Sequence, residues 1–264
     1  MKFFTLLKEK IRGYFAEHGY TCDACGKEVF DYPTHRLCTA CEENLPKNQA
    51  RTCQKCGRQT LAEGICLTCK VYPPSFTQGF SPLVYKEQSA GLVNRLKNGN
   101  PYLALYLGEK IAEYFLSRHE AKAEGLPYLI IPIPLTEKRM RERGYNQATE
   151  LAESLYKALT KQGISAELDL DILQKTRETG QQKHMTYLER MENASGAYHI
   201  HKRTACRERT ILLVDDILTT GATGGECAKL LKNAGAKEVY FLTATALPER
   251  DPPKEDHLQL PKSF

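Results

Sequence analysis

Closely spaced cysteine pairs dominate the first quarter of the chain. Eight of the ten cysteines form four Cys-x-x-Cys pairs before residue 70. Each pair can present two thiolates to one metal ion, and two pairs complete the four-sulfur shell that structural zinc prefers. In a reducing compartment, this spacing predicts two structural Zn²⁺ ions in place of disulfides. The predicted ligands are Cys22, Cys25, Cys38, Cys41, Cys53, Cys56, Cys66 and Cys69.

The cysteine region is also an internal repeat. Residues 21–26 (TCDACG) are echoed by residues 52–57 (TCQKCG), and residues 37–41 (LCTAC) by residues 65–69 (ICLTC). The repeat predicts two zinc ribbons in series, whereas pairing the first pair with the third and the second with the fourth is an alternative. Because the segment is short and polar, metal ligation should supply most of its folding free energy. A ribbon that only stabilises the fold and one that also binds DNA both fit this pattern.

A second group of residues suited to chemistry follows the apolar stretch 211–214. The chain there reads Asp215-Asp216 and continues into a threonine-rich loop, residues 219–223. In open α/β sheets ligands bind at the carboxyl ends of the strands. Backbone N–H groups of such a loop suit a phosphate, and the two aspartates are strong acceptors for sugar hydroxyls. The pattern predicts a site for a ribose 5-phosphate group; the loop that a Walker-type ATPase also needs is not found in the sequence.

Alternating apolar strands and amphipathic helices must position these residues. We expect strands at 79–85, 128–133, 210–214 and 238–244, and helices at 88–97, 103–118, 147–161 and 223–234. This alternation predicts an α/β fold with a mostly parallel sheet covered on both faces. The predicted units are an amphipathic helix (1–20), a double zinc ribbon (21–72), an α/β domain (78–247) and a disordered tail (248–264).

Composition excludes several classes of protein. The chain has 264 residues, of which 41% are hydrophobic and 26% charged, as in ordinary globular proteins. No run of about 18 uncharged apolar residues is present, so we expect no membrane-spanning helix. Lys8, Glu9 and Lys10 interrupt the apolar N-terminal stretch, which predicts a cytoplasmic protein without a signal peptide. The helical spacing of that stretch fits peripheral contact with the inner face of a membrane, or packing on the protein itself.

The residues also carry a family resemblance. Residues 211–223 resemble the phosphoribosyl pyrophosphate (PRPP) motif of type I phosphoribosyltransferases, and four cysteine pairs ahead of it make the chain similar to the ComF family of competence proteins. The likeness extends to Leu96-Lys97-x-Gly99, to residues 131–135 (IPIPL), to residues 143–147 (RGYNQ) and to segment 179–193. It implies a double zinc ribbon, with four cysteines on each ion, followed by a type I phosphoribosyltransferase-like, Rossmann-like domain.

This resemblance implies roles for individual residues. Asp215 and Asp216 would bind the ribose hydroxyls of Mg²⁺-bound PRPP, and Arg190 would reach phosphate from a closing loop; these three are the implied catalytic residues. Arg139 and Arg143 would neutralise pyrophosphate, although exposed helix positions would explain them equally well. The full implied PRPP site is Asp215, Asp216, Thr219, Thr220, Gly221, Ala222, Thr223, Pro134, Leu135, Arg139 and Arg143.

The resemblance implies a role in bacterial competence. A ComF-type protein would act in natural transformation on incoming single-stranded DNA, with a ComFA-like competence helicase as a partner. The net charge of +5 and pI of 8.6 permit nucleic-acid binding without demanding it. The alternative is an active phosphoribosyltransferase in nucleotide metabolism. Residues 79–100, the expected acceptor hood, show no base-reading pattern, so the sequence identifies no acceptor.

Overall fold

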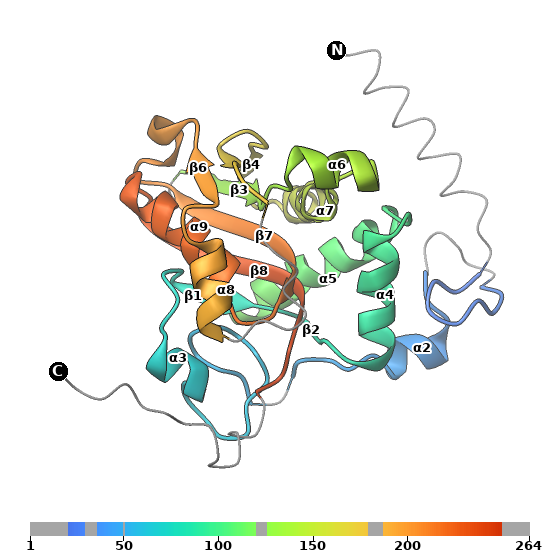
Figure 1. Cartoon of the computed structure of the whole chain (residues 1–264). Coiled ribbons are helices and arrows are strands. Elements are labelled where there is room, and N and C mark those ends of the chain that lie inside the picture. The colour runs from blue at the N-terminus through green and yellow to red at the C-terminus, as the bar shows by residue number, and fades with distance from the viewer. Residues whose placement is uncertain (1–20, 30–35, 50, 120–125, 179–186, 250–264) are drawn as a thin grey trace, which may run out of the picture.

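A computed structural model describes residues 21–29, 36–49, 51–119, 126–178 and 187–249 (Figure 1). The predicted N-terminal helix and all but the first two residues of the predicted tail lie outside these ranges. Across the described residues, no helix combines the length and apolar character needed to cross a bilayer.

A parallel sheet lies at the centre of the molecule (Figure 1). Its strands are β1 (Gln78–Phe80), β2 (Leu83–Val84), β3 (Tyr128–Pro132), β4 (Ala166–Leu168), β7 (Thr210–Leu218) and β8 (Glu238–Ala246). They are hydrogen-bonded in the order β1, β8, β7, β3, β4, with β2 also beside β8, and every pair is parallel. A separate antiparallel pair joins β5 (Leu173–Lys175) to β6 (Tyr198–Ile200). The predicted mostly parallel α/β sheet is confirmed.

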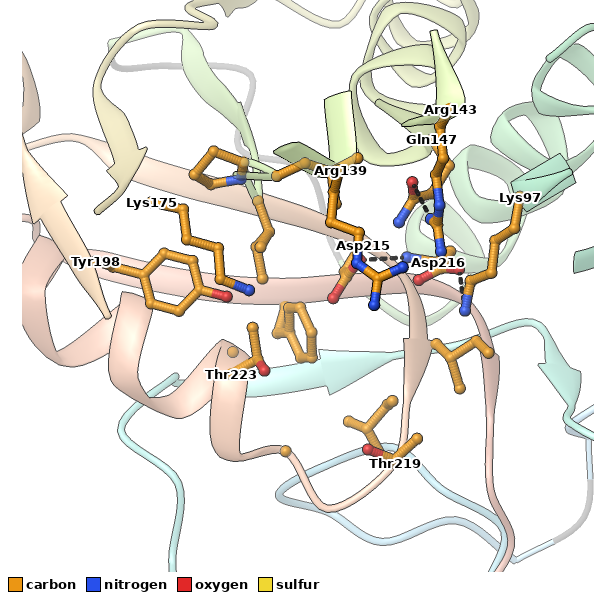
Figure 2. A pocket seen from close by; sticks show the side chains of 18 of the residues that line it. Lys97, Arg139, Arg143, Gln147, Lys175, Tyr198, Asp215, Asp216, Thr219 and Thr223 are labelled. Carbon is orange, nitrogen blue, oxygen red and sulfur yellow. Dashed lines mark hydrogen bonds and ion pairs between the residues drawn. The ribbon is translucent and has the colours of Figure 1, made fainter. Parts of the chain in front are cut away.

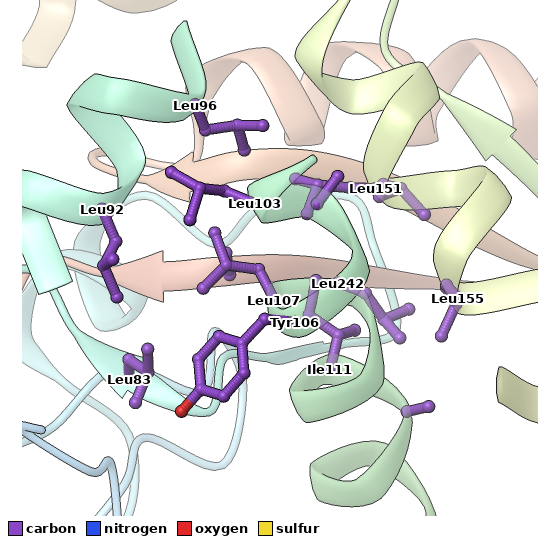
Figure 3. Packing of buried hydrophobic residues seen from close by; sticks show 14 of the residues in the cluster. Leu83, Leu92, Leu96, Leu103, Tyr106, Leu107, Ile111, Leu151, Leu155 and Leu242 are labelled. Atoms are coloured by element: carbon purple, nitrogen blue, oxygen red, sulfur yellow. The ribbon is translucent and has the colours of Figure 1, made fainter. Parts of the chain in front are cut away.

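Helices cover both faces of this sheet, with α5 and α7 on one face and α9 on the other. The helices of the described residues are α2 (Thr39–Glu43), α3 (Leu67–Val71), α4 (Glu87–Lys97), α5 (Leu103–Arg118), α6 (Glu137–Arg143), α7 (Gln147–Lys161), α8 (Tyr187–Ala194) and α9 (Ala222–Asn233). Leu212 and Val214 of β7 join the apolar cluster of α5 and α7. Figure 3 shows part of this cluster, including Leu107 of α5 and Leu151 of α7. Ile211 and Leu213 join the opposite cluster, which includes the fully buried Cys227 of α9. Full burial of each such aliphatic side chain contributes about 2 kcal/mol.

The predicted strands differ in extent from the observed ones. The strand expected to end at residue 214 continues to Leu218, so that both aspartates belong to β7. The neighbouring β8 extends to Ala246 and offers backbone partners, including Thr243 opposite Asp215. The strand expected over 79–85 is instead split into β1 and β2, because Pro82 has no N–H for the ladder.

The two cysteine repeats pack against opposite faces of the sheet. Cys22 and Cys41 of the first repeat belong to the apolar cluster around α5 and α7. The four cysteines of the second repeat belong to the cluster around α9. Asn48, which lies between the repeats and is fully buried, donates through its side-chain amide to the carbonyl oxygens of Gly57 and Ser81. Both repeats therefore share the apolar cores of the α/β fold.

Candidate functional site

The loop of residues 219–223, called the phosphate loop below, joins β7 to α9 at the carboxyl edge of the sheet. Gly221 has a φ of +86° and precedes the first residue of α9, a conformation that favours glycine. The Thr220 hydroxyl accepts a hydrogen bond from the Ala222 N–H at 3.3 Å. The fully buried Phe76 ring packs beside Gly221. Loop N–H groups and the positive end of the α9 dipole together suit a phosphate.

Two adjacent carboxylates lie next to the phosphate loop (Figure 2). Asp216 is 4% exposed, and its Oδ2 lies 2.7 Å from Nζ of Lys97 in α4. The Asp215 carboxylate accepts a hydrogen bond from the Asp216 backbone N–H at 2.9 Å. Burial, together with the neighbouring Asp216 carboxylate, raises the pKa of Asp215 well above its ordinary value. The pair offers strong hydrogen-bond acceptors that one lysine partly neutralises.

Helix α6 brings two arginines to the other side of the site. The Thr136 hydroxyl caps the helix by accepting from the Arg139 N–H at 3.3 Å, and it donates to the Glu178 carboxylate. The Arg143 guanidinium donates to Oε1 of Gln147, the first residue of α7, at 2.8 Å. Because both guanidiniums face the aspartates across the cavity, this side of the site is suited to an anion (Figure 2).

These groups converge on one cavity of about 290 Å³. The sequence-predicted residues that line it are Pro134, Leu135, Arg139, Arg143, Asp215, Asp216, Thr219, Gly221 and Thr223. Thr220, Ala222 and Arg190 are not among the described residues lining the cavity. Arg190 is half-buried on α8, next to residues that the structure does not describe.

The cavity also has lining residues to which sequence reasoning gave no role, namely Lys97, Gln147, Lys175, Glu178 and Tyr198. Lys175 of β5 and Tyr198 of β6 are opposite each other in the antiparallel pair, with the lysine Nζ 5.4 Å from the ring centroid. Burial lowers the pKa of Lys175, although the nearby Asp215 carboxylate opposes that shift. For Lys97 and Gln147 the sequence did contain a signal that they line the site, because both belong to segments that carry the family resemblance.

Each cysteine repeat gathers four sulfur atoms. Cys22, Cys25, Cys38 and Cys41 form one group, and Cys53, Cys56, Cys66 and Cys69 form the other; within each of these four-cysteine groups all sulfurs lie within 4.8 Å of one another. The first pair of each repeat lies on a tight turn closed by an antiparallel bridge, and the second pair begins α2 or α3. This geometry brings the pairs together in series, not in the interleaved arrangement.

The donor set of each group fits a metal ion. Four thiol sulfurs at this spacing match the tetrahedral shell of a structural site. In the second group, the backbone N–H groups of Lys55, Cys56 and Cys66 point at the Cys53 sulfur from 3.3 to 3.4 Å. Such N–H groups stabilise a thiolate bound to metal. Each four-cysteine group can therefore hold one metal ion.

If the two four-cysteine groups bind metal independently, removing one group should leave the metal ion of the other in place. Cys22→Ser combined with Cys25→Ser removes two of the four sulfurs of the first group only. We expect metal analysis of the purified variant to fall from two bound ions per chain to about one. Loss of both ions would contradict two separate sites.

Comparison with known proteins places this geometry in a class. A family model described as the phosphoribosyl transferase domain matches residues 140–259. Competence protein F of Haemophilus influenzae is 29% identical over 249 residues, which cover 90% of this chain and 96% of that protein. Competence protein ComFC of Bacillus subtilis is 26% identical and covers 77% of this chain and 80% of its own. DNA utilization protein YhgH of Escherichia coli K12 is 25% identical, with coverages of 77% and 87%.

The fold and the matched domain define a type I phosphoribosyltransferase-fold protein whose N-terminal part carries two four-cysteine groups. Its similarity to competence protein F covers 90% of the chain. In this domain and in its similarity to competence protein F and ComFC, the chain resembles the ComF family of competence proteins.

Proposed function

We propose that the cavity binds PRPP as its magnesium complex. The observation that carries the proposal is the convergence of two carboxylates, an anion-binding loop and two arginines on one cavity. In this proposal Asp215 and Asp216 accept hydrogen bonds from the ribose hydroxyls, and the phosphate loop binds the 5-phosphate. Arg139 and Arg143 face the pyrophosphate, beside the turn that follows β3.

Other residues of the chain support this binding mode. Lys97 holds Asp216 in place through their 2.7 Å ion pair. Thr220 and Ala222 shape the phosphate loop through their hydrogen bond, although neither lines the cavity. We keep Arg190 in the proposal as a residue that reaches phosphate when ligand binds. Mg²⁺, when bound with PRPP, neutralises part of the pyrophosphate charge.

The two ends of the proposed site can be tested separately. Replacing Arg139 and Arg143 by glutamine should weaken PRPP binding about tenfold or more, since charged hydrogen bonds to pyrophosphate are lost. Ribose 5-phosphate, which has no pyrophosphate, should bind both proteins with similar affinity. Arg141→Gln is the matched control, because that side chain is 75% exposed on the same helix. Equal losses for both ligands would contradict the assignment of the arginines.

We further propose that the protein acts in natural transformation on incoming single-stranded DNA, with one Zn²⁺ in each four-cysteine group. Support comes from the names of its relatives, which are competence and DNA utilization proteins. If phosphate contacts carry DNA binding, log affinity for a labelled single strand should fall linearly and steeply with log salt concentration. Binding that is insensitive to salt, or absent at low salt, would contradict this part. The helicase partner and the membrane contact implied by the family resemblance stay predictions.

A second candidate function is phosphoribosyl transfer. It is favoured by the polar side chains of Lys175 and Tyr198, which line the cavity together with Asp215. In this reaction the C1–O bond of PRPP breaks, pyrophosphate leaves with the electron pair, and an acceptor nucleophile bonds to C1. The residues named above would orient PRPP and stabilise the departing charge. Pyrophosphate release that requires an added acceptor would establish transfer, whereas binding without release would favour a regulatory pocket.

A further inference from the structure

Arg58 connects the second four-cysteine group to the phosphate loop. Its side chain is buried, with only 6% of the residue exposed. Nε donates a hydrogen bond to the Cys56 sulfur at 3.2 Å, and Nη2 donates to the backbone carbonyl of Thr219 at 2.7 Å. A single planar guanidinium thus contacts both a metal-binding sulfur and the first residue of the phosphate loop.

The contact depends on the state of the sulfur. A thiolate bound to metal accepts a charge-assisted hydrogen bond, whereas a protonated thiol is a weak acceptor. The buried guanidinium is therefore best compensated when Cys56 is a metal-bound thiolate.

The surroundings of Arg58 hold the ribbon firmly on the sheet. Gly57 packs against the backbone of Gly79, and the Gly79 N–H donates to the Lys55 carbonyl at 2.9 Å. On the far side of the ribbon, the Glu249 carboxylate accepts from the backbone N–H of Leu67 at 2.7 Å. Because the ribbon is fixed at these points, a change at the metal-binding sulfurs reaches the loop through a short, rigid path.

The first repeat has no equivalent bridge among its described residues. Its residue at the position of Arg58, one after the repeat glycine, is Lys27, and that side chain is exposed. The two four-cysteine groups therefore differ in a way that the sequence repeat conceals. Lys27 supplies a natural matched control for Arg58.

We propose that Arg58 is a positioning residue that couples metal binding at the second four-cysteine group to phosphate binding at the phosphate loop. The proposal rests on PRPP binding as proposed above. Coupling between two sites is reciprocal, so PRPP must strengthen metal binding by the factor by which metal strengthens PRPP binding. The first four-cysteine group takes no part in this coupling.

Metal release from the full chain tests the coupling. A chromogenic chelator is added to protein loaded with two Zn²⁺, with and without saturating Mg²⁺-PRPP. With the chelator at equilibrium with the wild-type chain, we expect PRPP to raise the affinity for one zinc equivalent about fivefold or more. In Arg58→Gln that difference should vanish, and Arg58→Lys should not restore it, because one ammonium cannot span both acceptors. Lys27→Gln should behave as wild type.

Hydrogen exchange gives a readout that does not need PRPP. Variants are first shown by metal analysis to retain two zinc ions. The peptide containing residues 215–225 should exchange several times faster in Arg58→Gln than in the wild-type chain or in Lys27→Gln, with peptides from β3 unchanged. Unchanged exchange in Arg58→Gln, or PRPP protection of zinc that survives this substitution, would overturn the coupling. Failure of the wild-type chain to bind PRPP would instead overturn the proposed function.

Discussion

Gly57→Ala should destabilise the protein by about 3 to 5 kcal/mol, far more than the equivalent change at Gly26 in the first repeat. Gly57 has a φ of +73°, which an alanine adopts only with strain. A Cβ at this position would also lie 2.1 Å from the carbonyl oxygen of Gly79, a contact that backbone atoms cannot relieve without moving β1. The steric cost therefore adds to the conformational one.

The control for this substitution lies within the sequence repeat. Gly26 has nearly the same φ, +75°, but nothing lies within 4 Å of the Cβ that alanine would add. Gly26→Ala should therefore cost only the strain of the left-handed conformation, about 1 to 2 kcal/mol. Urea unfolding of the metal-loaded proteins measures both values. Equal losses would contradict the close packing of the second ribbon on the sheet.

Asp215→Asn should abolish PRPP binding and yet stabilise the ligand-free protein at neutral pH. Burial and the Asp216 carboxylate raise the pKa of Asp215 above its ordinary value of 3.8. Ionised Asp215 therefore disfavours the folded state. Asparagine keeps the shape of the side chain and removes the charge repulsion, at the expense of an acceptor for the ribose hydroxyls.

The pH dependence of unfolding tests this explanation. The stabilising contribution of protonated Asp215 is complete below about pH 4, the ordinary pKa range of a free aspartate, and is lost as pH rises through the raised pKa of the folded state. Over this interval the wild-type chain should lose free energy of unfolding, whereas Asp215→Asn should show a flatter curve and greater stability at pH 7. Asp171→Asn, which changes an exposed carboxylate, is the control. If Asp215→Asn were less stable than wild type at pH 7, this would contradict the explanation by repulsion between the Asp215 and Asp216 carboxylates.

Helices with a continuous apolar stripe could be predicted from the sequence alone. The expected bounds of α5 and α7 agree with the structure, because buried apolar residues recur at helical spacing through both. Asn146 caps α7 by accepting from the Ala148 N–H, which is a local signal. The end of β7 could not be predicted in this way, since its last residues are held by pairing with β8 and not by their own propensity.

In the candidate site, too, the features set by local sequence could be predicted, and those set by tertiary packing could not. The aspartate pair and the phosphate loop are contiguous in sequence, so their chemistry could be recognised directly. Lys97 reaches Asp216 from a distant part of the chain, and only the packing of α4 near the end of β7 brings them together. Lys175 and Tyr198 lie on strands of three residues each, which are too short to give a periodic pattern.

The central claim is that the cavity binds PRPP, and calorimetric titration of Mg²⁺-PRPP into the zinc-loaded full chain tests it most directly. The matched variants are Asp215→Asn with Asp216→Asn, and Asp169→Asn with Asp171→Asn, which changes two carboxylates paired with Lys202 outside the cavity. We predict saturable binding near one PRPP per chain for wild type and for the second variant, and none for the first. No binding by the wild-type chain, or binding that survives in the first variant, would contradict the assignment of this site.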